Sequence, residues 1–259
     1  MCCRHGPTDS AMDEDRLYRD AALARFYDLD NGWTDDRSFC LNMARGCASV
    51  LDLGCGTGEL AIRIAGDYHT AVTAVDPALA MLNLARSKRG AGRVTWVEAD
   101  ARDLDLGRSF DLIVMTGHAF QSLLSERDRA ACLTAFARHL APEGRFIFDS
   151  RNPARCEWRE WRPALSRREI ADPEFGSVAA WNDVAWDSAN YIATYETVYL
   201  VTSDGHEFRA SSQIAFPSLK ELKRLIAAAG LTVDTWFGDW TGAPLAADSA
   251  EFIPLGRRA

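Results

Sequence analysis

Lysine and a surplus of positive charge are what this sequence most lacks. Only three of its 29 basic residues are lysines (Lys88, Lys220 and Lys223), and 37 acidic residues give the 259-residue chain a formal net charge of −8. A broad phosphate-binding surface needs clustered Lys and Arg. The deficit therefore argues against nucleic acid as a partner.

Metal-binding and membrane-spanning patterns are missing as well. The seven cysteines form no C-x-x-C pair and no histidine stands at metal-ligand spacing, so we expect no metal. No apolar run approaches the roughly 18 residues of a membrane span, and the first ten residues lack the apolar core of a signal peptide. An odd number of cysteines suits reduced thiols. We expect a soluble, cytoplasmic protein, with Cys2 and Cys3 in a frayed terminus rather than carrying a lipid.

What is present is an ordinary globular composition, with 47% hydrophobic and 25% charged residues. At about 150 residues per domain, the length predicts one large domain with an appendage. Tryptophan is unevenly spread, because six of the eight lie after residue 157. These side chains are too large and apolar to leave in water. We expect some to line a substrate chamber and others to lie in the contact of a homodimer.

Between residues 46 and 153, short apolar runs alternate with longer stretches of helical periodicity. The expected strands are 50–53, 71–75, 94–97, 111–115 and 145–149, and helices are expected to begin at Glu59, to follow Pro77 and to span 127–140. Strands that alternate with helices predict a doubly wound, Rossmann-like parallel sheet with helices on both faces. One or two further helices are expected in the first 45 residues.

The pattern changes after residue 153. Residues 151–169 are crowded with Arg and Trp, without a clean period. Three later stretches, at 178–186, 191–201 and 206–216, are rich in β-branched and aromatic residues, with a hairpin signal at 203–205. They predict a small antiparallel β lid inserted after the fifth strand. The core then resumes with a capping box at Ser218 and Glu221 and two final strands, which makes seven in the sheet.

The most informative segment is Val50–Glu59 (VLDLGCGTGE), in which three glycines stand where a strand turns into a helix. Glycine lets the backbone approach a ligand closely, and the helix amides that follow favour acceptor or anionic groups. Asp76 ends the second strand, where a carboxylate can bind both hydroxyls of a ribose. A dinucleotide would place its pyrophosphate near Glu59, which would repel it. An NAD(P)-dependent oxidoreductase is therefore the less favoured alternative.

This segment resembles the first motif of class I S-adenosylmethionine-dependent methyltransferases, and other motifs follow in order. Glu98–Ala101 resembles the third motif, Phe110–Val114 the fourth strand, and His139–Asp149 the helix, turn and strand after it. Residues 27–36 (YDLDNGWTDD) are similar to the N-terminal cap of the small-molecule N- and O-methyltransferase branch. The resemblance implies an antiparallel last strand and a substrate lid in the insertion. Motifs of base-amino and cytosine-carbon methyltransferases are missing.

The resemblance also implies how S-adenosylmethionine binds. Asp76 would hold the ribose, Asp52 the methionine ammonium, and Asp100 the adenine together with the amide of Ala101. An aromatic from the cap would close over the methionine end, and Met81 would pack near the adenine. Capping or turn roles for the three acids and core packing for Met81 are the simpler alternatives. The expected cofactor-binding residues are Tyr27, Trp33, Asp52, Gly54, Cys55, Gly56, Thr57, Gly58, Asp76, Pro77, Met81, Asp100, Ala101, Met115 and Thr116.

His118 follows the fourth strand, at the rim where such folds place substrate. As a general base it would accept the proton that a methylated hydroxyl or amine loses. Alignment alone suffices in many methyltransferases because the sulfonium is already activated, so orienting the substrate or capping a helix are the alternative roles. Gln121, Arg151, Trp158 and Trp181 are the other expected substrate contacts, although a solvated surface fits the Arg- and Trp-rich segment equally well.

We therefore expect transfer of a methyl group from S-adenosylmethionine to a nitrogen or oxygen of a small molecule by in-line displacement. A non-catalytic S-adenosylmethionine-binding protein would share every motif and is the main alternative. The expected division is a helical cap (1–45), a cofactor-binding core (46–153), a lid (154–216) and the remainder of the core (217–259). The lid decides the substrate, and it contains no motif that identifies one.

Overall fold

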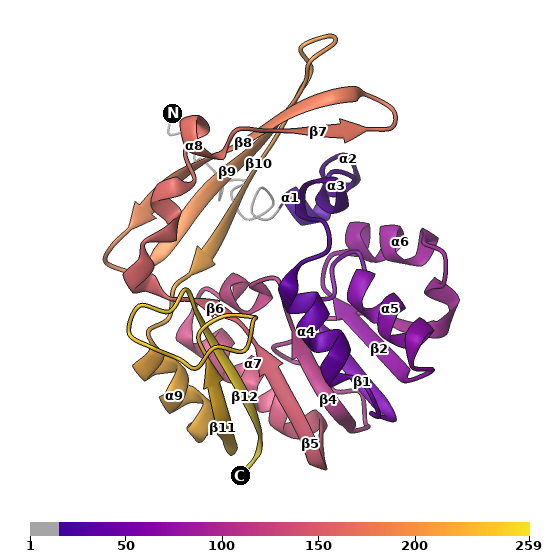
Figure 1. Cartoon of the computed structure of the whole chain (residues 1–259), viewed down its shortest axis with the longest axis vertical. Coiled ribbons are helices and arrows are strands. Elements are labelled where there is room, and N and C mark those ends of the chain that lie inside the picture. Colours follow the sequence, from indigo (N-terminus) through magenta and orange to yellow (C-terminus); the bar gives the residue numbers. More distant parts are fainter. Residues whose placement is uncertain (1–15) are drawn as a thin grey trace, which may run out of the picture.

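The core of the molecule is one mixed sheet, seen in a computed structural model that describes residues 16–259 (Figure 1). The predicted terminal pair Cys2 and Cys3, with the first part of the predicted cap, lies outside the described residues. The strand order is β11-β12-β5-β4-β1-β2-β3, with β6 paired to β12. The strands are β1 (Ser49–Leu53), β2 (Ala71–Asp76), β3 (Val94–Glu98), β4 (Phe110–Met115), β5 (Leu140–Phe148), β6 (Ser150–Arg151), β11 (Leu231–Phe237) and β12 (Glu251–Arg258).

The direction of the last strand confirms the predicted fold class. Strands β1 to β5 pair in parallel, whereas β12 lies between β5 and β11 and runs antiparallel to both. Strand β5 begins at Leu140 rather than at Arg145. Its register against β4 nevertheless jumps, from Phe110 opposite Leu140 to Leu112 opposite Arg145, so the turn expected within His139–Asp149 is present as an irregularity of the strand.

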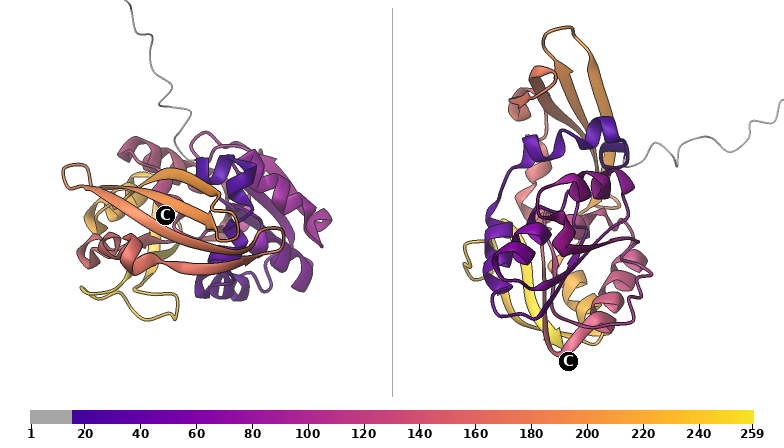
Figure 2. Two further views of the ribbon diagram at one scale, coloured as in Figure 1. Left: turned by 90° about the horizontal axis from the view of Figure 1, so that it is seen from above. Right: turned by 90° about the vertical axis from the view of Figure 1, so that its right-hand side faces the viewer.

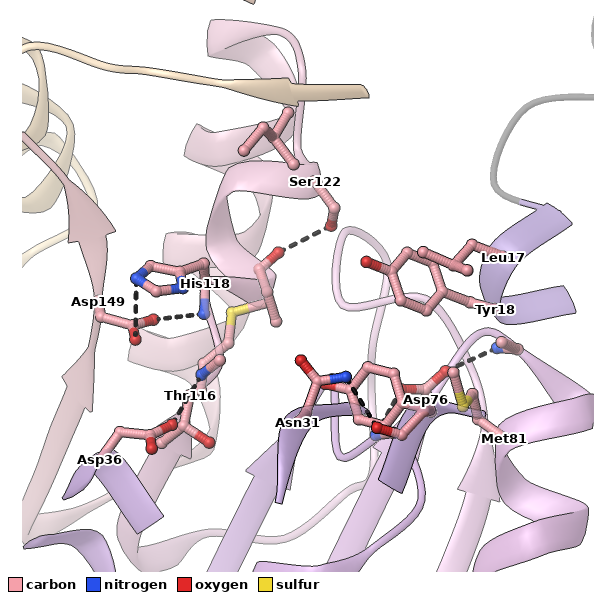
Figure 3. A pocket seen from close by; sticks show the side chains of 18 of the residues that line it. Leu17, Tyr18, Asn31, Asp36, Asp76, Met81, Thr116, His118, Ser122 and Asp149 are labelled. Atoms are coloured by element: carbon pink, nitrogen blue, oxygen red, sulfur yellow. Dashed lines mark hydrogen bonds and ion pairs between the residues drawn. The ribbon is translucent and has the colours of Figure 1, made fainter. Parts of the chain in front are cut away.

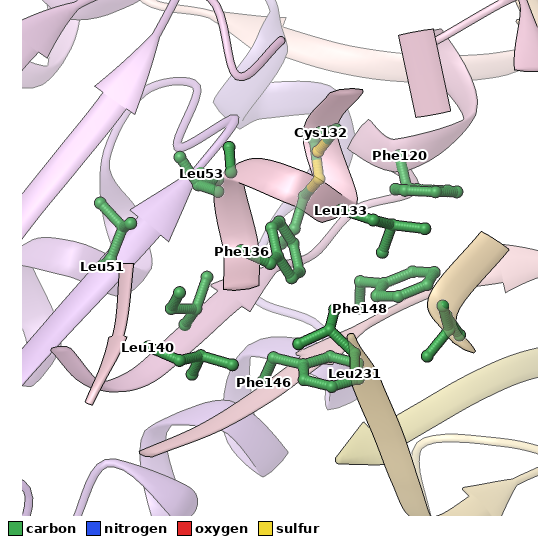
Figure 4. Close-up of a cluster of buried hydrophobic side chains, with 14 of the residues drawn as sticks. Leu51, Leu53, Phe120, Cys132, Leu133, Phe136, Leu140, Phe146, Phe148 and Leu231 are labelled. Carbon is green, nitrogen blue, oxygen red and sulfur yellow. The ribbon is translucent and has the colours of Figure 1, made fainter. Parts of the chain in front are cut away.

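Helices cover both faces of the sheet, because alternate residues of each strand point to opposite sides. Leu51 and Leu53 of β1 pack with Phe136 and Phe148 in one cluster (Figure 4), whereas Val50 packs with Ile64 in the other. Helices α7 (Glu126–His139) and α9 (Leu219–Ala228) cover the first face, and α4 (Asp35–Met43) and α5 (Glu59–Asp67) the second. Helix α6 (Leu79–Ser87) and the 3-10 turns η2 (Ala91–Arg93) and η3 (Ala119–Ser122) complete the core.

A second sheet forms the lid, which lies across the top of the molecule above the core (Figure 2). The three predicted lid strands are present as β8 (Gly176–Asp187), β9 (Ile192–Val201) and β10 (Glu207–Ala215), and a fourth, β7 (Arg168–Asp172), extends the order to β10-β9-β8-β7. The charged residues of β7 concealed its alternation, in which Ile170 and Asp172 are buried. The connection from the core contains η4 (Pro153–Arg155), η5 (Glu157–Glu160) and α8 (Pro163–Ser166).

Aromatic packing fixes the lid at both ends. At the base, Trp158 stacks on Trp186 at 3.8 Å between ring centroids, and both rings contact Phe216. At the far end, the short cap helices α1 (Arg16–Arg19), α2 (Ala21–Ala24) and α3 (Tyr27–Asn31) lie against the lid, where Phe26 stacks on Tyr199 at 4.5 Å. Two of the six late tryptophans thus anchor the lid, whereas Trp161 and Trp240 line the cavity described below. None of the helices in residues 16–259 is long and apolar enough to cross a membrane.

Candidate active site

A cavity of about 1360 Å³ lies where the core, the cap and the lid meet. The carboxyl ends of β1, β2 and β4 form its floor, since parallel strands end at one edge of the sheet. Its volume exceeds the roughly 300–1,000 Å³ of a pocket for one small ligand. The cavity therefore has room for a cofactor together with an acceptor.

The glycine turn after β1 forms one end of the floor. Gly54, Gly56 and Gly58 have positive φ angles of 67°, 54° and 73°, which favour glycine. A Cβ on Gly54 would stand 2.7 Å from the Cβ of Ala119. Gly58 caps α5 and stands too close to Trp96 to carry a side chain. Gly54 and Gly56 line the cavity, so the turn leaves backbone, and no side chain, at the position where a ligand can approach.

Asp76 stands beside this turn at the end of β2. Its carboxylate accepts hydrogen bonds from the amides of Gly56 and Ala78, both at 2.8 Å, and burial raises its pKa despite these bonds. Met81 and Pro77 line the cavity next to it. The structure thus brings together the residues expected to hold a ribose and pack against an adenine (Figure 3).

Asp100 and Ala101 also line the cavity, but Asp100 is occupied by its own loop. Arg102 contacts both of its carboxylate oxygens, at 2.9 and 2.6 Å. Burial, which would raise the pKa of this carboxyl, is outweighed by these bonds, so the pKa is lowered. Asp100 therefore favours the carboxylate form, and an amino group at this edge of the cavity would share its oxygens with Arg102.

Asp52 is buried beneath the turn and does not line the cavity. Burial raises its pKa to about 7, against the opposing charge of Arg37. Sequence reasoning missed Arg37, which lines the cavity from α4. No motif marks this arginine, and only the packing of α4 against the core places its charge near Asp52.

The remaining cap and turn residues fall into two groups. Tyr27 lines the cavity, and burial raises its pKa to about 12. Thr57 donates to Asp28 of the cap, and Asp28 pairs with Lys88 at 2.6 Å, so these contacts fasten the cap to the core. Trp33 is 43% exposed and lies outside the cavity lining, as do Cys55, Thr57 and Gly58.

The other end of the floor is built around His118, with Met115 and Thr116 before it. The His118 amide donates to Asp149 Oδ1 at 2.9 Å, and its ring Nε2 lies 2.8 Å from Glu251 Oε1 and 3.8 Å from Asp149 Oδ2. Burial and Arg151 lower the pKa of the imidazole, but the two acids outweigh them and the pKa is raised. Burial raises the pKa of Asp149 to about 6. We call His118, Asp149, Glu251 and Asp36 the acidic cluster.

Asp36, Asp149 and Glu251 were not among the expected site residues, although all three line the cavity. They come from α4, from the end of β5 and from the start of β12. Asp36 accepts a hydrogen bond from the amide of Gly117 at 3.1 Å. Figure 3 shows Asp36, Thr116, His118 and Asp149 on one side of the cavity and Asp76 and Met81 on the other. No group of three or more His, Cys, Asp or Glu within residues 16–259 is arranged to hold a metal ion.

Of the expected substrate contacts other than His118, only Arg151 lines the cavity. Gln121 is buried and positions Arg151, because its Oε1 accepts from the Arg151 amide at 3.2 Å and from its guanidinium at 3.1 Å. Trp158 lies in the stack at the base of the lid, and Trp181 lies under the guanidinium of Arg167 at 5.2 Å. Arg168, Asn182 and Tyr199 line the lid side instead, and Arg168 forms an ion pair with Asp30 of the cap.

Comparison with known proteins gives matches along most of the chain. Residues 50–144 match the model of a methyltransferase domain. The cypemycin N-terminal methyltransferase of Streptomyces sp is 31% identical over 216 residues, which cover 81% of this chain and 83% of that protein. The O-methyltransferase cnsE of Penicillium expansum is 36% identical over 103 residues, covering 38% of this chain and 36% of its own length.

Among solved structures, the chain is similar to CalS10 of Micromonospora echinaspora, described as an amino pentose methyltransferase with S-adenosylmethionine bound. The TM-score is 0.64 at 23% identity, and the match covers 98% of this chain and 100% of that one. At this identity the likeness shows a shared fold.

Proposed function

The chain belongs to the class I S-adenosylmethionine-dependent methyltransferases, and on that premise we propose how its cavity divides between the cofactor and the acceptor. The protein transfers a methyl group from S-adenosylmethionine to a nitrogen or oxygen of a small molecule. The single observation that carries the division is the cavity itself, which joins the glycine turn and Asp76 to the acidic cluster.

At the cofactor end, the carboxylate of Asp76 would accept the two ribose hydroxyls, and the amide of Gly56 would face the same region. Met81 and the loop with Asp100 and Ala101 would enclose the adenine. Arg37 would face the carboxylate of the methionine end, and the charge of Asp52, buried beneath the turn, would favour the ammonium from behind the lining. When bound, S-adenosylmethionine supplies a methyl group on a positively charged sulfur, which needs an aligned nucleophile and exclusion of water.

At the acceptor end, we propose that His118 is a positioning residue rather than the general base. Its raised pKa favours the imidazolium, which has no lone pair to accept a proton. Its ring nitrogen and its backbone amide hold Glu251 and Asp149 in place. The lid would select the acceptor, with Tyr27 and Arg151 at its border.

The wider biology follows from composition and exposure. We propose a cytoplasmic enzyme, because Cys40, Cys47, Cys55, Cys132 and Cys156 are all free thiols. The net charge of −8 argues against a nucleic-acid acceptor. A homodimer stays a prediction, and the stacking of Trp158 on Trp186 removes part of its original argument.

Substitution of Asp76 tests the cofactor end. Asp76→Ala should weaken S-adenosylmethionine binding about 100-fold or more, because a hydrogen bond to a charged group contributes about 1.5–3 kcal/mol. Calorimetric titration of the full chain measures the change. Asp103→Ala is the matched control, since Asp103 is an exposed acid outside the cavity lining. Equal affinity of the two variants would remove the ribose assignment.

A further inference from the structure

Three carboxylates of the acidic cluster each keep one buried oxygen without a hydrogen-bond partner. These atoms are Asp36 Oδ1, Asp149 Oδ2 and Glu251 Oε2. The other oxygen of each carboxylate is bonded, to the Gly117 amide, the His118 amide and the His118 ring. A buried oxygen without a donor costs free energy and is rare in native proteins. All three residues line the cavity, so a ligand that brings several donors and turns these carboxylates toward itself would satisfy them.

The surrounding charges favour a cation. The cluster holds three carboxylates and one imidazole, so it carries a negative excess even when His118 is protonated. Arg151 is paired with Glu157 at 2.8 Å and Arg37 acts on Asp52. Arg102 and Arg168 are paired with Asp100 and Asp30. Of the arginines that line the cavity, Arg102, Arg151 and Arg168 are therefore engaged with acids outside the cluster.

We propose that the methyl acceptor is an amine and that Asp149 and Glu251, with Asp36 beside them, bind its amino group as an ammonium ion; this rests on the proposed function. A primary ammonium ion offers three N–H donors, which is the number of unpartnered oxygens. A hydroxyl offers one donor and no charge. A hydroxyl acceptor would leave two buried carboxylate oxygens unpaired, and the site would discriminate against it.

The proton balance agrees with this assignment. The ammonium must lose one proton to expose its lone pair, and Asp149 can accept that proton because burial raises its pKa to about 6. The nitrogen lone pair then forms the bond to the methyl carbon, and the electron pair of the C–S bond moves to sulfur. The products are S-adenosylhomocysteine and a methylated ammonium that retains one positive charge.

Binding of a simple amine tests the proposal without knowledge of the natural acceptor. The full chain is saturated with S-adenosylhomocysteine and titrated at neutral pH with benzylamine and with benzyl alcohol, which differ only in the group of interest. Benzylamine should bind about 10-fold or more tightly, since a charged hydrogen bond is worth about 1.5–3 kcal/mol. Asp149→Asn and Glu251→Gln should each remove most of this preference.

The control is Asp239→Asn, which removes an acid from the lining of the same cavity. The Asp239 carboxylate is bonded within its own turn, to Thr241 at 2.8 Å, so this variant should keep the preference. Equal binding of amine and alcohol by the wild type would overturn the proposal, as would equal losses in all three variants. Unchanged affinity for S-adenosylhomocysteine shows that a variant is folded. Failure of the wild type to bind S-adenosylhomocysteine would instead remove the proposed function.

Discussion

Both ends of the cavity use buried carboxylates, but the hydrogen bonding of these carboxylates differs between the two ends. At the cofactor end, both oxygens of Asp76 accept backbone amides at 2.8 Å from its own neighbourhood. At the acceptor end, Asp149 and Glu251 each leave a buried oxygen without a donor. The first end is complete as folded, whereas the second is completed by what binds there. A pre-formed site suits a cofactor that a whole family shares. Carboxylate oxygens that lack a hydrogen-bond donor instead allow the site to discriminate between acceptors.

The largest effect on cofactor affinity is expected from a substitution in the glycine turn. Gly54→Val should weaken S-adenosylmethionine binding about 100-fold or more, because it adds a β-branched side chain at φ +67° and within 2.7 Å of Ala119. Gly107→Val is the matched control, since Gly107 has φ +61° but no neighbour within 4 Å. Calorimetry below the unfolding temperature of both variants measures the affinities. Equal binding by the two would mean that the turn does not shape the cofactor end.

The same contrast explains what the sequence could predict. The glycine turn and Asp76 belong to consecutive strand–turn–helix units, and Asp100 lies in the turn directly after β3, so local patterns were enough to place them. Glu251 reaches His118 across 133 residues, because β12 enters the sheet between β5 and β11. No local pattern encodes that contact.

The lid was also only partly predictable from the sequence. Its strands were predictable from β-branched and aromatic residues, except for the charged β7. The position of its tryptophans was not, since Trp158 was expected at the substrate and instead stacks on Trp186. Composition predicts that such rings are buried, but the groups that they pack against depend on the tertiary structure.

An intermediate effect should follow from removal of the His118 ring. The imidazolium lowers the pKa of Asp149, so His118→Gln should raise that pKa further above about 6. Carboxyl titration by 13C NMR of labelled aspartate, assigned with Asp149→Asn, measures the shift. Affinity for S-adenosylhomocysteine should stay unchanged. A loss of that affinity would place His118 at the cofactor end. An unmoved Asp149 titration would show that the ring does not act on Asp149. Either result would contradict the positioning role.

The smallest effect is expected from Asp52, the acid of the cofactor end whose pKa burial raises to about 7. Its pKa of about 7 in the fold exceeds the roughly 3.9 of an unfolded chain. The folded state therefore binds more protons between about pH 4 and pH 7, and stability is lost as the pH rises through that window. Above about pH 7 the loss is complete and constant.

Asp52→Asn avoids this loss, so it should raise the Tm of the ligand-free protein at pH 8 and have no such advantage at pH 4. Each kcal/mol corresponds to about 2–4 °C in a domain of this size. Asp67→Asn is the control, because Asp67 is an exposed acid that pairs with Arg63 on α5. This variant should show no pH-dependent gain in Tm. Saturating S-adenosylmethionine should reduce the advantage of Asn at pH 8, because the positive charge of the bound cofactor favours only the carboxylate. If Asn instead lowers the ligand-free Tm at pH 8, the ionised Asp52 is already satisfied by the fold. The fold alone would then stabilise every carboxylate of the cofactor end, including the buried Asp52.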